Sequence, residues 1–355
     1  MERKIETCIL HIGTEKTGTT TLQGFLALNR DKFLEKGYFI PTTLSPYPDI
    51  ANHERLTTYA LNPIKTTDDL RVAAGLKTSD DVELHRANIV EGLRSELGNL
   101  GCIPNTLLLS NEHCHSRLVE DGEVALLKAM LGEFVNNFRV VVYLRPQHDL
   151  AVSLYSQALR AGHFDIDILP DFDRMGKYWV RKRYFNYLDL LTRWSAIFGV
   201  DNIIARIYSK EELVSGSIID DFMSVIEVDA SNLTKPGNLN PNISGDLQPV
   251  LNAFNRFSQS HPHETTAEHR THLIKALESL SKGSGSYPNR SDAERFFRIF
   301  DESNEEVRRT FFPNRERLFV TDFSAFPEEA MPRVPEADAL VRTILRLLSA
   351  EAPRD

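Results

Sequence analysis

Residues 11–20 read His-Ile-Gly-Thr-Glu-Lys-Thr-Gly-Thr-Thr and follow the first apolar run of the chain. Two glycines, Gly13 and Gly18, bracket a short turn, and hydroxyl-bearing residues follow at the start of a predicted helix. In such a loop, backbone N–H groups and the helix N-terminus bind an anion. The segment therefore predicts a strand, a phosphate-binding loop and a helix in that order.

The position of the lysine in this loop separates the chain from ordinary nucleotide kinases. The P-loop of NTP-hydrolysing proteins reads G-x-x-x-x-G-K-[ST]. Gly13 and Gly18 fit that frame, but Thr19 occupies the lysine position. Lys16 lies three residues earlier, inside the loop. An ATP-dependent kinase therefore lacks its expected lysine here.

The composition limits the function classes. The chain has 355 residues, 41% of them hydrophobic, and a formal charge of −9. An acidic chain lacks the basic surface that general nucleic-acid binding needs. The three cysteines are too few for a disulfide framework, and we expect neither a signal peptide nor a membrane span. These features predict a cytoplasmic protein.

Hydrophobic patterns predict an α/β fold. Apolar runs suggest strands at 7–13, 106–110, 139–144 and 202–208, and residues 38–40 should be extended. Helices are expected at 19–29, 79–97 (capped by Ser79), 123–137, 147–161 and 184–198. Alternation of strands and helices indicates a central parallel sheet flanked by helices, a P-loop-type three-layer sandwich. Residues 42–78 read as an insertion with some helix, which we expect to lie over the active site.

The pattern changes after residue 235, where Pro236 and Gly237 interrupt the chain. Helices are predicted at 243–258, 266–281, 292–307 and 336–349. We expect a core at 1–235 and a helical C-terminal part at 236–355, packed on that core.

A second anion signal follows the strand predicted at 139–144. Arg145 leaves this strand, and Ser153 lies eight residues later, about two turns along the next helix. The planar guanidinium of arginine suits a phosphate because it donates several hydrogen bonds. The alternative is that Arg145 pairs with Asp149 and that Ser153 merely lies on the helix.

Together, the K-x-G-T-T loop and the R-x7-S segment resemble those of sulfotransferases that use 3′-phosphoadenosine 5′-phosphosulfate (PAPS). The resemblance covers about the first 230 residues and is closer to bacterial, glycan-modifying members than to cytosolic small-molecule ones. It implies that the loop holds the 5′-phosphosulfate, through the residues Gly13, Lys16, Thr17, Gly18, Thr19 and Thr20. It also implies that Arg145 and Ser153 hold the 3′-phosphate.

The resemblance extends to two further segments. Tyr208, at the end of the last predicted strand, corresponds to a tyrosine near the adenine, although it could equally be a core aromatic. Lys282 and Gly283 resemble a late K-G loop that covers the cofactor, although a plain surface loop fits nearly as well.

Sulfuryl transfer needs a base that takes the proton of the acceptor hydroxyl. Glu112 is the preferred candidate, because it follows a buried strand and because many glycan-modifying sulfotransferases use a glutamate, whereas cytosolic ones use a histidine. His113, His115 and His53 are the alternatives, and His53 requires the insertion to fold over the site. Glu112 could instead pair with Arg145 or Lys16. A metal cluster at 112–115 lacks a partner motif, so no metal is expected.

Residues 174–187 mix cations with aromatic side chains, which suits a sugar chain, although buried aromatics with solvated cations are the favoured interpretation. The sequence thus predicts a PAPS-dependent sulfotransferase acting on a hydroxyl of a glycan, glycolipid or similar acceptor. In this hypothesis Lys16 neutralises charge on the leaving oxygen. The rivals are a small-molecule kinase and a non-catalytic nucleotide-binding relative.

Overall fold

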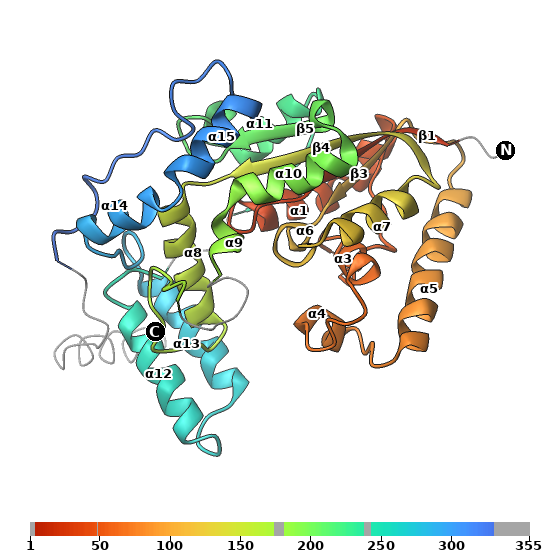
Figure 1. The fold of residues 1–355 in the computed structure, drawn as a ribbon. Coiled ribbons are helices and arrows are strands. Elements are labelled where there is room, and N and C mark those ends of the chain that lie inside the picture. The colour runs from red at the N-terminus through yellow and green to blue at the C-terminus, as the bar shows by residue number, and fades with distance from the viewer. Residues whose placement is uncertain (1–3, 48, 174–180, 238–242, 330–355) are drawn as a thin grey trace. The chain divides into compact units, whose positions relative to one another are not determined.

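The computed structural model describes residues 4–47, 49–173, 181–237 and 243–329, and Figure 1 draws their helices and strands. The chain packs into two compact units. The first comprises Met1–Arg145, Arg183–Leu239 and Ser303–Leu318, and the second comprises Pro146–Lys182, Asn240–Glu302 and Phe319–Asp355. Each unit therefore consists of three separate segments of the chain, whereas the sequence suggested two continuous parts with one boundary near residue 235. The division into a core at 1–235 and a helical part at 236–355 stays a prediction.

The first unit contains a five-stranded sheet in the order β2-β3-β1-β4-β5. Its strands are β1 (Ile5–His11), β2 (Tyr38–Phe39), β3 (Thr106–Ser110), β4 (Val135–Leu144) and β5 (Ile203–Ile207). Every neighbouring pair is parallel, and His11 is in register with Ser110 on one side and Val141 on the other. The predicted α/β architecture with a central parallel sheet is confirmed.

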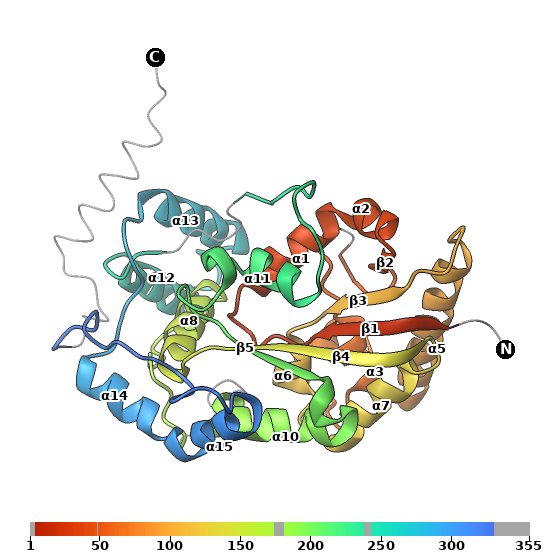
Figure 2. The same ribbon diagram turned by 90° about the horizontal axis from the view of Figure 1, so that it is seen from above.

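One face of the sheet is covered by α1 (Thr19–Leu28), α2 (Arg30–Glu35) and α11 (Ile218–Val225). Ile9, Leu108 and Val141 of the strands share a buried cluster with Phe25 of α1 and Phe222 of α11. In Figure 2, α1 and α11 lie together on one side of the strands. Burial of this apolar face fixes α1, and therefore the loop that precedes it, against the end of β1.

The opposite face carries the alternate strand residues Leu10, Leu109 and Val142, which are fully buried. The helices α7 (Asp121–Leu131) and α10 (Tyr187–Phe198) pack on each other, and α10 also packs on β4 and β5. Both lie across the strands from α1 and α11 in Figure 2. Burial on both faces explains why these strands are continuous apolar runs.

The segment between β2 and β3 forms three helices, α3 (Arg55–Ala60), α4 (Asp69–Ala73) and α5 (Ser79–Gly98). It is tied to the end of β3, because the His53 N–H donates to the Ser110 carbonyl (2.9 Å) and the Asn111 amide donates to Thr57 Oγ1 (2.8 Å). Thr78, not Ser79 as predicted, caps α5 by accepting a hydrogen bond from the N–H of Asp81 (3.1 Å).

The remaining short elements of the first unit are α6 (His113–Arg117) and the 3₁₀ turns η2 (Val200–Asn202) and η3 (Val214–Gly216). The second unit contains α8 (Gln147–Arg160), α12 (Gln248–Ser260), α13 (Ala267–Leu280) and α14 (Arg290–Arg298). Leu159 of α8, Leu251 of α12 and Leu277 of α13 meet in its core. Each of the two helices α9 (Lys182–Phe185) and α15 (Asp301–Phe311) contains a boundary between the units, so its first residues belong to the second unit and the others to the first.

Two predicted helices are wrong in extent. Residues 135–137 belong to β4, because Ile5 and Thr7 of β1 pair with Val135 and Asn137, so α7 ends at Leu131 rather than at 137. The helix predicted at 292–307 is two helices, α14 and α15, separated at residues 299–300. The helix predicted at 336–349 lies outside the described residues.

Candidate functional site

Four strands of the sheet end side by side at one edge. Because they are parallel and adjacent in the order β3-β1-β4-β5, the segments that follow them lie next to one another. Glu112 follows β3, the loop 12–18 follows β1, Arg145 follows β4 and Tyr208 follows β5. The sheet thus gathers the principal residues predicted for the first unit around the loop.

The loop after β1 has backbone φ angles that residues other than glycine rarely adopt. Gly13, Lys16 and Gly18 have φ values of 94°, 66° and 74°, all in the left-handed region. Within the loop, Thr17 Oγ1 donates to the Thr14 carbonyl (2.6 Å), and Thr14 Oγ1 donates to the Tyr143 carbonyl (3.0 Å). These two hydroxyls therefore fix the loop itself.

The backbone N–H groups of Thr17, Gly18 and Thr19 lie where the loop enters α1. Among the hydrogen bonds between described residues, none uses these three donors. The first N–H groups of a helix have no partner within the helix, and they point toward its N-terminal end. This arrangement suits an anionic oxygen, so the loop fits a phosphate or phosphosulfate group.

Both glycines allow close packing against other parts of the site. A Cβ atom on Gly13 would lie 3.1 Å from the Cα atom of Glu112, and one on Gly18 would lie 3.1 Å from the hydroxyl of Tyr208. The loop therefore contacts the Glu112 segment on one side and Tyr208 on the other. Thr20, one helical position further on, is exposed.

Arg145 is attached to the loop and to Tyr208. Its Nη1 donates to the Lys16 carbonyl (2.9 Å), and its guanidinium lies 5.7 Å from the centre of the Tyr208 ring. The hydroxyl of Tyr187 in α10 donates to the Arg145 carbonyl (2.5 Å). Arg145 therefore holds the loop in place, in addition to any contact with a ligand.

Glu112 lies opposite, at the start of α6, and is only partly buried. One of its carboxylate oxygens accepts a hydrogen bond from the amide of Gln23 in α1. Gln23 is buried, and its amide also lies 3.4 Å from Ser110 Oγ. Gln23 of α1, which itself lies near Ser110 of β3, thus orients the Glu112 carboxylate, and that carboxylate stays partly exposed beside the loop.

His113, the next residue, lies between two further carboxylates. Its Nδ1 is 3.7 Å from Oε1 of Glu15, and its Nε2 is 3.7 Å from Oε2 of Glu54, which are ion-pair separations. Burial lowers the pKa of His113, but the interaction with Glu15 and the charge of Glu112 outweigh it, so its pKa is raised. His113 is therefore held as a cation more readily than a free imidazole.

Glu15 belongs to the loop and is 5% exposed. Burial alone would raise its pKa, but His113 and Ser116 lower the pKa of Glu15 to about 2. Its Oε2 also accepts a hydrogen bond from the hydroxyl of Tyr184 (2.8 Å). Glu15 is thus an ionised, well-held carboxylate. Burial and the charge of Glu112 raise the pKa of Glu54, although His113 opposes them.

His53 and His115 are both buried and bonded to backbone atoms. His53 Nδ1 accepts from the Ser110 N–H (2.9 Å), and its Nε2 lies 3.1 Å from the Pro41 carbonyl. His115 Nε2 lies 3.0 Å from the Tyr184 carbonyl. Burial lowers the pKa of each to about 4. These contacts suit residues that hold the insertion and α6 in place, and they leave His53 without access to an acceptor.

Three predicted residues lie in the second unit. Ser153 is on α8 and partly buried, while Lys282 and Gly283 are exposed and follow α13. The loop that contains Lys282 and Gly283 is tied to the start of α12, because the Gly245 N–H donates to the Ser284 carbonyl (2.8 Å). The cofactor roles of these three residues stay predictions.

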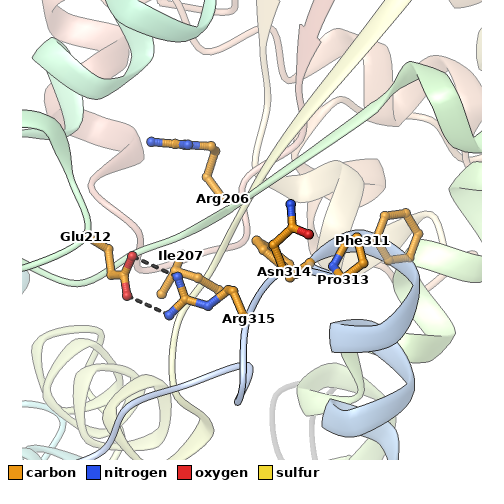
Figure 3. A pocket seen from close by; sticks show the side chains of 8 residues that line it. Arg206, Ile207, Glu212, Phe311, Pro313, Asn314 and Arg315 are labelled. Carbon is orange, nitrogen blue, oxygen red and sulfur yellow. Dashed lines mark hydrogen bonds and ion pairs between the residues drawn. The ribbon is translucent and has the colours of Figure 1, made fainter.

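A separate cavity of about 310 Å³ lies beside the end of β5 (Figure 3). Its two arginines are already paired. Arg315 donates to both carboxylate oxygens of Glu212 (2.9 and 2.6 Å), and Arg206 forms an ion pair with the fully buried Asp221 (2.6 Å). We therefore assign no phosphate to this cavity.

Gln23, Glu15 and Glu54 were not predicted from the sequence, and Tyr184 was predicted only as part of the mixed cation and aromatic patch. Gln23 lies one turn into α1, the helix that directly follows the loop, and this position close to the predicted phosphate-binding loop was a sequence signal for a site residue. Glu54 comes from a distant segment, and no local pattern marks it. Of the mixed cation and aromatic patch, Arg174, Lys177, Tyr178 and Trp179 lie outside the described residues, while Tyr184 and Tyr187 are buried as the favoured interpretation expects.

Across the described ranges, no group of three His, Cys, Asp or Glu side chains is placed to hold a metal ion. Likewise, no helix in the described part of the chain is both long and apolar enough to cross a membrane.

Comparison with known proteins gives distant similarities. No protein-family model matches the sequence. Over 189 residues the chain is 24% identical to an uncharacterised protein of Archaeoglobus fulgidus, a match that covers 52% of this chain and 48% of that protein. The chain thus spans about half the length of that relative.

Two solved structures with similar folds are sulfotransferases. One, from Alicyclobacillus acidocaldarius, has a TM-score of 0.42 and 13% identity, and the match covers 76% of this chain and 99% of that one. The other, a sulfotransferase domain from the curacin biosynthetic pathway, has a TM-score of 0.35 and 12% identity, covering 64% and 76%. At these values the function has to be argued from the residues of the site.

Proposed function

We propose that this protein is a sulfotransferase that moves the sulfuryl group of PAPS to a hydroxyl of an acceptor. One observation carries the proposal. Lys16 lies inside the loop that follows β1 and itself has a left-handed φ, and Thr19 occupies the position at which a kinase P-loop has its lysine. Around this loop the sheet places a carboxylate on one side and a guanidinium on the other.

The donor side of the site consists of the loop and Arg145. The N–H groups of Thr17, Gly18 and Thr19 bind phosphate oxygens, and Lys16 stabilises the negative charge that grows on the leaving oxygen. PAPS supplies a sulfuryl group on an oxygen shared with phosphate. Arg145 holds the loop and adds positive charge near Tyr208. The assignment of Arg145 and Ser153 to the 3′-phosphate comes from the sequence resemblance.

Glu112 is the proposed base. Its carboxylate is partly exposed and is oriented by Gln23, and the Cα and Cβ atoms of Glu112 lie against Gly13 of the loop. It takes the proton of the acceptor hydroxyl as the hydroxyl oxygen bonds to sulfur and the bond from sulfur to the bridging oxygen breaks. His113 is engaged with Glu15 and Glu54, and His53 and His115 are buried, so we do not keep the three histidines as bases.

A kinase is the main competing function, and ligand binding separates the two. We expect adenosine 3′,5′-bisphosphate, the desulfated product, to raise the melting temperature. At about 100 times its Kd it should stabilise the fold by roughly 2.7 kcal/mol. ATP with Mg²⁺ should have little effect, because Thr19 replaces the lysine that a kinase needs. A larger effect of ATP with Mg²⁺ would refute the proposal.

A non-catalytic relative would bind the bisphosphate but turn nothing over. Incubation with ³⁵S-labelled PAPS and a panel of hydroxyl acceptors, glycans included, tests this point. Labelled product that depends on both protein and acceptor supports the transferase. Tight bisphosphate binding without product from any acceptor would favour the binding protein.

A further inference from the structure

We propose that a cavity between α3, α4 and α5 binds the acceptor, and that it takes a neutral or cationic hydroxyl compound with a ring. This inference rests on the proposed function, since it names the substrate class of the same site. The cavity lies entirely within the first unit, and its volume is about 480 Å³. Pockets that hold small ligands typically range from about 300 to 1,000 Å³.

Glu54 belongs to the lining of the cavity and also contacts a residue beside the transfer site. Glu54 lines the cavity, and its Oε2 lies 3.7 Å from Nε2 of His113, the residue that follows Glu112. One carboxylate therefore faces both the cavity and the group beside the proposed base. His113, which Glu54 contacts, is the residue next to Glu112 along the chain.

The wall of the cavity is fixed to the strand that carries the base. Glu54 is the residue before α3, and α3 packs on α6. The Asn111 amide donates to the His53 carbonyl (3.0 Å) as well as to Thr57 Oγ1 (2.8 Å). Asn111 is the residue before Glu112, so the cavity and the base share one rigid connection.

The lining suits a ring with hydroxyl groups. Tyr47 is 59% exposed and offers an aromatic face, while Asn88 of α5 adds an exposed amide. His85 Nε2 and Thr58 Oγ1, both lining residues, form a hydrogen bond with each other (2.9 Å). Sites of this kind combine aromatic surface with a few polar groups that set orientation.

The charge of the site excludes anions near the reacting hydroxyl. Three carboxylates, those of Glu15, Glu54 and Glu112, surround the single imidazole of His113. Arg55 also lines the cavity and keeps its positive charge, because its Nη1 donates to the neutral Thr43 carbonyl (2.7 Å), but the groups paired with His113 are carboxylates. Like charges placed together without compensation oppose binding. An acceptor that already carries a carboxylate at this end would be rejected.

A matched set of probes tests both parts of the proposal. The probes are 4-nitrophenyl β-D-glucoside, the corresponding glucosaminide and the glucuronide, which are neutral, cationic and anionic. Their affinities are measured by calorimetry with the protein saturated in adenosine 3′,5′-bisphosphate. We expect the glucoside and the glucosaminide to bind at least about tenfold more tightly than the glucuronide.

Variants then locate the binding site. Asn88→Trp fills the cavity and should weaken glucoside binding by about tenfold or more, the effect of losing a central contact. Ala87→Trp is the control, because Ala87 is the exposed neighbour of Asn88 on α5 but does not line the cavity. Glu54→Gln should reduce the discrimination against the glucuronide. None of these changes should alter bisphosphate affinity.

Three results would overturn the assignment while bisphosphate still binds. These are no binding by the glucoside or the glucosaminide, equal losses in Asn88→Trp and Ala87→Trp, and unchanged discrimination in Glu54→Gln. A protein that fails to bind the bisphosphate contradicts the proposed function instead. The glycosides are then tested alone, so the two failures remain distinguishable.

Discussion

Replacement of Gly18 by alanine tests the geometry of the loop directly. Gly18 has a φ of 74°, and a Cβ atom there would lie 3.1 Å from the hydroxyl of Tyr208 and 3.1 Å from Cγ2 of Ile218. Both distances are shorter than ordinary van der Waals contact. The substitution therefore strains the backbone and also displaces Tyr208 or Ile218.

Gly75 provides a control that separates these two effects. Its φ is 72°, nearly the same, but a Cβ atom there would have no heavy atom within 4 Å. The left-handed conformation costs a non-glycine residue roughly 1–2 kcal/mol. Restriction of the unfolded chain returns about 0.4–1 kcal/mol. Gly75→Ala should therefore lower the free energy of unfolding by about 0–1.6 kcal/mol.

Gly18→Ala adds the displacement of packed side chains, which typically costs about 1–3 kcal/mol. We expect a total loss of about 1–4.6 kcal/mol in the free energy of unfolding, larger than that of Gly75→Ala by the cost of displacement. Urea denaturation followed by circular dichroism measures both variants under the same conditions. Adenosine 3′,5′-bisphosphate affinity should fall in Gly18→Ala and stay unchanged in Gly75→Ala. Equal stability losses in the two variants would refute the described contact between the loop and Tyr208.

Three other substitutions have distinct expected outcomes. Glu112→Gln should lower kcat by about 10²–10⁴ while the bisphosphate Kd stays unchanged. Asp221→Ala should destabilise the fold by about 2–5 kcal/mol, because the buried Tyr143 hydroxyl and the Val214 N–H lose their acceptor and Arg206 loses its partner. His113→Asn should cost most stability below about pH 6.5, where the protonated imidazole stabilises the fold, and less as the pH rises through its raised pKa.

Controls and contradicting outcomes follow from the structure. Near-normal kcat in Glu112→Gln, measured with an accepted substrate, would place the base elsewhere. Asp220→Ala, which removes a more exposed ion pair with Lys235, should cost only about 0–1 kcal/mol. A loss of that size in Asp221→Ala would contradict the buried network. A His113→Asn stability difference that grows with pH would contradict the assigned sign.

Much of the fold could be predicted because local patterns determine it. Strands buried on both faces appear as apolar runs, and β3 begins and ends where the run at 106–110 does. The start of β4 could not be predicted, because Val135–Asn137 become strand only through pairing with β1. Likewise, Thr78 rather than Ser79 caps α5, since either hydroxyl satisfies the sequence pattern.

The candidate site, like the fold, could be predicted only in part from the sequence. The positions of Lys16, Glu112 and Arg145 follow from strand ends that the sequence reveals. The left-handed φ of Lys16 and the hydrogen bond from Arg145 to its carbonyl depend on tertiary packing. Because of that bond, replacement of Arg145 should weaken binding of ligands with and without a 3′-phosphate, since the loop itself loses support.

The strand order accounts for the arrangement of charge in the proposed mechanism. Glu112 follows β3, and Arg145 follows β4, so the two lie on opposite sides of the loop that follows β1. In-line displacement requires the attacking and leaving oxygens to approach the transferred group from opposite directions. A hydroxyl deprotonated from the β3 side and a leaving oxygen stabilised by Lys16 meet that requirement. The order β3-β1-β4, more than any single side chain, therefore separates the acceptor side from the donor side.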